Sequence, residues 1–171
     1  LFLVVLTVPY FFRDWKRLLL LVSSFTLGHT LSLLLGVYDI INLKANVTEW
    51  LIPFTIIIMA IYNVFTSGKA SKYGNSVIIF SLVLFFGFIH GLGFANAFES
   101  LVSSSESTLL SVLEFAIGIE VGQFVIVFCI LFFGFLGQTI FRFSLRDWVM
   151  VISSIVIGLM LPLIFNSPLF S

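Results

Sequence analysis

Two histidines and two glutamates lie inside apolar stretches of this 171-residue sequence, where such side chains are costly. His29 and His90 are its only histidines, and Glu114 and Glu120 fall within the long apolar run that begins at Thr108. An ionisable side chain at the centre of a membrane-spanning helix costs about 2.5 kcal/mol or more, so such groups face the interior of a helix bundle and mark binding sites or pathways. Imidazole nitrogens and carboxylate oxygens together suit divalent transition metals.

The spacing of the neighbouring residues suggests polar faces on two helices. Thr26, His29 and Thr30 are spaced i, i+3, i+4, and Glu120 and Gln123 are spaced i, i+3. Counted at about 1.5 Å per residue, both histidines and both glutamates fall at compatible depths of a core about 30 Å thick. We therefore expect a metal site with the candidate ligands His29, His90, Glu120, Gln123 and Glu114, supported by Thr26, Thr30 and Asn63.

Glycines accompany these candidates and predict close helix contacts, because a small residue lets two backbones approach. They are Gly87, Gly91 and Gly93 around the second histidine, and Gly118 and Gly122 as a small-xxx-small pattern beside the second glutamate. A purely structural reading stays open, in which both imidazoles are neutral and only hold helices together. Interhelical hydrogen bonds of that kind stabilise a bundle by about 0.6 kcal/mol on average. This is small compared with the cost of placing ionisable groups so deep in the membrane.

The elements that carry these residues are predicted to be membrane-spanning helices. Apolar residues make up 60% of the chain and charged residues 9%, with a mean hydropathy of +1.22, whereas a soluble domain has about a quarter charged residues. The apolar runs are too long and too continuous for the alternating strands of a barrel. We expect an all-α, single transmembrane domain over residues 1–171, with about six helices in the segments Leu1–Phe12, Leu18–Val37, Trp50–Thr66, Ser76–Phe98, Thr108–Phe135 and Trp148–Phe165.

The first of these segments is too short to cross a membrane. Twelve helical residues rise only about 18 Å, against a hydrocarbon core of about 30 Å. The chain also starts at Leu1 inside an apolar run and without Met. We therefore expect the first helix to be truncated at its N-terminus, with further residues upstream in the natural protein.

The basic residues predict how the chain is oriented. Seven of the eight lie in alternate connections: Arg13, Lys16 and Arg17, then Lys69 and Lys72, then Arg142 and Arg146. By the positive-inside rule the odd-numbered connections are cytoplasmic, which places the C-terminus outside. The net charge is zero, so no overall field favours nucleic acid as a partner. The single cysteine, Cys129, has no partner for a disulfide.

The chain also resembles a known family. The stretches Phe25–Leu33, Leu51–Pro53 with Tyr62 and Asn63, Phe88–Ala95 and Gly118–Gln123 together resemble the HupE/UreJ family of bacterial membrane proteins. The resemblance implies a multi-pass protein of the inner membrane, linked with nickel supply to hydrogenase or urease and commonly described as a nickel or cobalt permease. The positions that match are His29, His90, Glu120 and Gln123. Members typically have an Asp-His pair just before a segment like residues 1–6, and this chain begins after that point.

We therefore expect transport of nickel or cobalt, with Zn²⁺ as a further ion that the ligands suit, and with lipid and a second copy of the chain as partners. A non-transporting accessory subunit that binds metal is the alternative. An intramembrane metalloenzyme is the third reading, and the residues argue against it. The chain has no H-E-x-x-H motif, and two histidines are too few for a histidine-rich di-iron site.

Overall fold

The structure is a computed structural model, and it describes residues 1–41, 43–67, 76–101 and 108–167. Every regular element in these ranges is a helix, which confirms the all-α prediction. The α-helices are α1 (Phe2–Thr7), α2 (Trp15–Val37), α3 (Ala45–Thr66), α4 (Ser76–Leu101), α5 (Thr108–Thr139) and α6 (Leu145–Phe165), with a short 3-10 helix η1 at Phe12–Asp14. The helices α2 to α6 are long and apolar enough to cross a membrane.

The first helix is shorter than the predicted segment, because it ends at Thr7 and not at Phe12. Pro9 explains the difference, since proline has no backbone N–H to continue the helical hydrogen bonds. In an unbroken helix the carbonyl of Val5 would accept from residue 9. Here the Val5 carbonyl accepts instead from Asn63 Nδ2 on α3, at 2.6 Å. The break in α1 is therefore stabilised by a side chain from another helix.

Three of the longer helices, α2, α3 and α6, begin earlier than hydropathy predicts, because polar residues form their first turns. Before α2, the Asp14 carboxylate accepts from the backbone N–H of Phe11 at 3.0 Å. At the start of α6, the Ser144 hydroxyl accepts from the Asp147 N–H at 3.1 Å, which is an ordinary N-cap. Charged and capping residues lower the local hydropathy without interrupting the helix.

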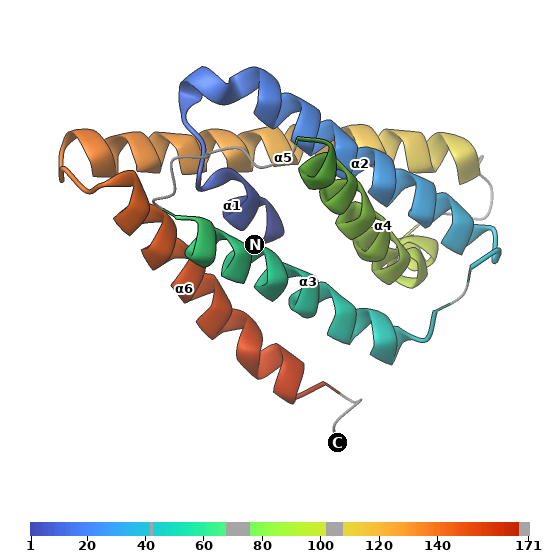
Figure 1. The fold of residues 1–171 in the computed structure, drawn as a ribbon. Helices are drawn as coiled ribbons and strands as arrows, with labels where there is room; N and C mark the ends of the chain where they lie inside the picture. Colours follow the sequence, from blue (N-terminus) through green and yellow to red (C-terminus); the bar gives the residue numbers. More distant parts are fainter. Residues whose placement is uncertain (42, 68–75, 102–107, 168–171) are drawn as a thin grey trace.

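The helices alternate in direction between two ends of the bundle (Figure 1). Figure 1 shows α2 running across α4, α3 and α6 side by side, and α1 enclosed among the longer helices. The α1–α2 link, the end of α3 and the α5–α6 turn lie at one end. The predicted basic connections that fall on described residues therefore share one end of the molecule. Lys69, Lys72 and Glu106 lie outside the described residues, as does the C-terminal Ser171.

The helix α5 packs least against the others. Its 32 residues would extend about 48 Å, more than the core of a bilayer, so its ends reach the interfacial regions. A Cβ placed at Gly118 or Gly122 would meet no atom within 4 Å. The predicted small-xxx-small contact at these two glycines was therefore wrong for the part of the chain that the structure describes. The face of α5 that carries them is open.

Candidate functional site

The candidate site is built on a close crossing of α2 and α4. A Cβ at Gly28 of α2 would collide with the carbonyl oxygen of Leu84, and one at Gly87 of α4 would collide with that of Phe25. Backbone therefore lies against backbone at both positions, a distance that only glycine permits. This part of the glycine prediction is confirmed.

The same crossing places the backbone next to His90 against that of His29. A Cβ at Gly91 would collide with the carbonyl oxygen of His29 and with the hydroxyl of Ser32. The Ser32 hydroxyl itself donates to the His29 carbonyl at 3.0 Å. Because Gly91 directly follows His90, the backbones of the two histidines lie at the same level of the crossing.

The ring of His90 is held by one polar contact and two aromatic ones. Its Nε2 lies 3.1 Å from Thr55 Oγ1 on α3. Its ring centroid is 5.3 Å from that of Phe25, nearly perpendicular to it, and 5.4 Å from that of Phe2. Such edge-to-face and tilted arrangements are favourable for aromatic rings. Three helices besides its own therefore set the orientation of the imidazole.

The hydrogen bonds of Thr55 favour one tautomer of His90. A threonine hydroxyl has a single proton, and that of Thr55 donates to the carbonyl of Ile52 at 2.8 Å. Toward His90 the hydroxyl oxygen is then an acceptor, so Nε2–H donates to it. The other nitrogen, Nδ1, keeps a lone pair. A hydrogen bond at one imidazole nitrogen commonly orients the other for a metal ion.

His29 is buried among aromatic rings and is 7% exposed. Its ring centroid lies 6.2 Å from that of Phe25, 6.3 Å from that of Phe94 and 6.4 Å from that of Phe115. Among the described residues neither ring nitrogen has a hydrogen-bond partner. A neutral imidazole keeps a lone pair on one ring nitrogen, so a His29 ring without a protein partner can offer that lone pair to a ligand.

Phe25 lies beside both imidazoles. Its ring centroid is 6.2 Å from that of His29 and 5.3 Å from that of His90, so the two imidazole centroids are separated by at most the sum of these distances. Both histidines therefore pack on the same aromatic ring. A cavity of about 360 Å³ adjoins His90 and is also lined by Phe25, Pro53 and Met160. Space for a small ion or water exists on one side of this pair.

The helix α5 brings its two candidates to α2. The Ser23 hydroxyl donates to Glu120 Oε1 at 2.7 Å, and the Thr26 hydroxyl donates to Gln123 Oε1 at 3.1 Å. Gln123 and Thr26 are buried, and Glu120 is half-buried. Thr26, which we predicted as a supporting residue, thus bonds to a candidate ligand. These bonds join α2 to α5 one turn before His29.

The remaining candidates lie apart from the histidines. Glu114 is exposed, on a side of α5 about 120° from Glu120. Thr30 is half-buried on α2. Asn63 donates from Nδ2 to the Val5 carbonyl at the break in α1. Its predicted supporting role at the metal site stays a prediction.

The structure thus shows two adjoining groups and no single preassembled cluster. Within the described ranges, no three side chains of His, Cys, Asp or Glu are close enough together to hold a metal ion. One group holds the two imidazoles around Phe25, and the other holds the carboxylate and amide of α5 against α2.

Sequence reasoning missed Thr55, Ser23 and Phe25. Thr55 and Ser23 each bind a candidate residue from a different helix, and the ring of Phe25 contacts both imidazoles. Each is an unremarkable residue in an apolar stretch. The one available signal was helical spacing, because Ser23 precedes Thr26 by three positions on the polar face of α2.

Comparison with known proteins supports one family. The family model described as HupE/UreJ protein matches residues 1–166. No curated protein and no solved structure matches the chain.

Proposed function

Because the chain belongs to the HupE/UreJ family, which is associated with nickel and cobalt transport or accessory roles, we propose that it carries a divalent transition-metal ion across the bacterial inner membrane. Nickel and cobalt are the proposed substrates, and the protein is not proposed to be an enzyme. The observation that carries the proposal is His29, a buried imidazole with no hydrogen-bond partner among the described residues, beside a second imidazole whose Nδ1 lone pair is free of the Thr55 bond.

The ion, as substrate, binds first between the imidazoles. Imidazole nitrogens suit Ni²⁺ and Co²⁺, and a site with few strong ligands releases its ion readily, as transport requires. His29 and His90 supply the nitrogens. Glu120 then compensates the charge of the ion, because an uncompensated divalent cation at this depth is costly. For this step the Glu120 carboxylate exchanges its bond with Ser23 for one with the ion.

The direction of entry follows from the charges at the two ends. The α2–α3 end carries exposed Asp39 and Glu49, and the opposite end carries most of the basic residues. We place the acidic end outside, where it attracts cations, and the odd-numbered connections in the cytoplasm. Protons compete with the metal for the imidazole lone pairs, so acidic conditions weaken binding.

A metal-binding accessory subunit is the second candidate. It is supported by the association of the HupE/UreJ family with accessory roles as well as transport. Such a protein would bind nickel without moving it. Reconstituted vesicles separate the two functions, because only a transporter accumulates the ion inside.

The first test is uptake of radiolabelled nickel by vesicles containing the purified protein. His29→Ala and His90→Ala should each lower initial uptake by more than about tenfold, since each removes a nitrogen ligand. Ser24→Ala is the matched control, because Ser24 lies on the same helix and bonds only to its own backbone at Leu20. Wild-type rates in both histidine variants would contradict the proposal. Binding without uptake in the wild type would favour the accessory function.

A second test addresses the orientation of His90. Thr55→Val removes the hydroxyl that accepts from Nε2–H and should raise the nickel concentration for half-maximal uptake by about tenfold. Thr55→Ser keeps the hydroxyl and should retain nearly normal uptake. If valine and serine behave alike, Thr55 acts through packing and not through the imidazole.

A further inference from the structure

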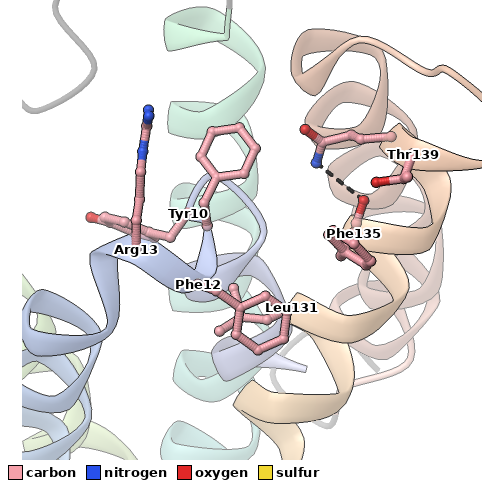
Figure 2. A pocket seen from close by; sticks show the side chains of 9 residues that line it. Tyr10, Phe12, Arg13, Leu131, Phe135 and Thr139 are labelled. Carbon is pink, nitrogen blue, oxygen red and sulfur yellow. Dashed lines mark hydrogen bonds between the residues drawn. The ribbon is translucent and has the colours of Figure 1, made fainter.

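A second cavity lies on the side of the bundle, where the link between α1 and α2 faces the last turns of α5. Its volume is about 330 Å³, within the range of small-molecule pockets. Figure 2 shows Tyr10, Phe12 and Arg13 on one side of it and Leu131, Phe135 and Thr139 of α5 on the other. None of the candidate metal ligands lines this cavity. This cavity is therefore separate from the proposed metal site.

The walls of the cavity are mainly aromatic and aliphatic, with a few polar groups. The ring of Phe12 packs on Phe128 of α5, with centroids 6.1 Å apart, which joins the two walls. Gln138 also lines the cavity and donates from Nε2 to the carbonyl of Gly134 at 3.2 Å, a bond drawn in Figure 2. An apolar wall with a polar upper edge matches the junction between an acyl chain and its headgroup.

Arg13 supplies a cation at the edge of the cavity. Its guanidinium lies 5.1 Å over the ring of Phe11, which also lines the cavity. This cation–π contact holds the side chain against the wall. Within the described part of the chain, Arg13 makes no hydrogen bond or ion pair. Its N–H donors are available to an anion.

The other basic residues at this end of the bundle add to the positive charge of Arg13. The basic residues of this end lie on the α1–α2 and α5–α6 connections and in the first turns of α2 and α6, which share one end in Figure 1: Arg13, Lys16, Arg17, Arg142 and Arg146. The acidic residues of these connections, Asp14 and Asp147, serve as acceptors at helix starts. An anion approaching the cavity therefore meets a positive field.

We propose that this cavity binds an anionic phospholipid from the adjoining leaflet, with its phosphate at Arg13 and an acyl chain along Phe12, Leu131 and Phe135. A guanidinium binds phosphate oxygens through two parallel N–H donors, and basic pockets between membrane helices commonly hold anionic headgroups. A neutral phospholipid lacks the net charge, and a free phosphate ion cannot occupy the apolar wall. The bound lipid joins the link after Pro9 to α5.

Native mass spectrometry of the purified full chain in detergent tests this proposal, with added phosphatidylglycerol, phosphatidylcholine or inorganic phosphate. Phosphatidylglycerol should be retained in preference to phosphatidylcholine, and inorganic phosphate should not displace it. Arg13→Gln should weaken retention of phosphatidylglycerol on the order of tenfold, the loss of one charge-assisted contact. Thr139→Trp, which fills the cavity from an exposed position, should weaken it without removing any charge.

Lys16→Gln is the matched control, because Lys16 carries the same charge at the same end but does not line the cavity. Equal losses in Arg13→Gln and Lys16→Gln would overturn the proposal in favour of a general attraction to anionic surfaces. Equal retention of the two lipids would also overturn it. Displacement by inorganic phosphate alone would show an anion site that has no lipid specificity, which contradicts the proposal as well. None of these measurements involves metal, so their outcome is independent of the transport function.

Discussion

Asn63 shows how a single polar side chain can replace a missing backbone donor inside an apolar bundle. Pro9 leaves the carbonyl of Val5 without its helical partner, and the Asn63 amide donates to that carbonyl from a residue 58 positions away. Asn63 is 2% exposed, so water is not available to take its place. A carbonyl left unpaired in such a position retains its full desolvation cost.

We predict that Asn63→Leu destabilises the protein by about 1–3 kcal/mol, because it leaves the Val5 carbonyl unsatisfied. Thermal unfolding of the detergent-solubilised protein measures the change. The exposed Asn46 at the start of the same helix is the control, and Asn46→Leu should have a much smaller effect. If the two variants unfold at the same temperature, the hydrogen bond from Asn63 to α1 does not stabilise the protein as described.

The candidate ligands were recognisable at the residue scale, but their partners were not. His29, His90, Glu120 and Gln123 stand out in the sequence because ionisable and amide side chains are rare in membrane-spanning segments. Ser23 and Thr55 do not stand out, because hydroxyls are common in such helices and can bond to their own backbone. Only the packing of α3 on α4 and of α5 on α2 shows that these two hydroxyls have long-range partners.

At the scale of elements, the crossing of α2 and α4 positions the histidines. Gly28, Gly87 and Gly91 each place one helix against the backbone of the other. By contrast, Gly118 and Gly122 on α5 have open space around them. All five glycines lie in helices, so their propensity costs are similar and their packing differs.

This contrast gives a prediction that compares two chemically identical changes. Gly91→Ala should destabilise the bundle by about 1–3 kcal/mol, because the new methyl group meets the carbonyl of His29 and the hydroxyl of Ser32. Gly118→Ala should be neutral or stabilising by up to about 1 kcal/mol, because alanine favours a helix and nothing obstructs it. Thermal unfolding of both variants in one detergent is the measurement. Equal destabilisation would mean that the close contact at Gly91 is not formed.

At the scale of the whole molecule, the alternation of the helices separates the described charges between two ends. Arg142 and Arg146 lie with Arg13 at one end, while Asp39 and Lys44 lie at the other (Figure 1). The excess of basic residues on short loops sets orientation during membrane insertion. The arrangement therefore predicts which connections a membrane-impermeant reagent can reach from outside the cell.

Thiol labelling of intact spheroplasts tests that orientation. In a Cys129→Ala background, Lys44→Cys on the α2–α3 link should react with a membrane-impermeant maleimide added outside. Phe141→Cys on the α5–α6 turn should react only after the cells are lysed. Both positions are exposed, so a difference reflects the side of the membrane. The reverse pattern would invert the proposed topology and with it the direction of entry.

The sequence alone determined the all-helical class, the approximate helices and the polar residues that attract attention, because hydropathy and helical spacing are properties of each segment by itself. Tertiary structure decided which faces meet. It paired Asn63 with the Val5 carbonyl that Pro9 leaves without a helical donor, left Gly118 and Gly122 open, and set Phe25 beside both imidazoles. The interhelical contacts, among them the bond from Ser23 to Glu120 across 97 positions, depend on the rotation and crossing of whole helices, which no local pattern specifies.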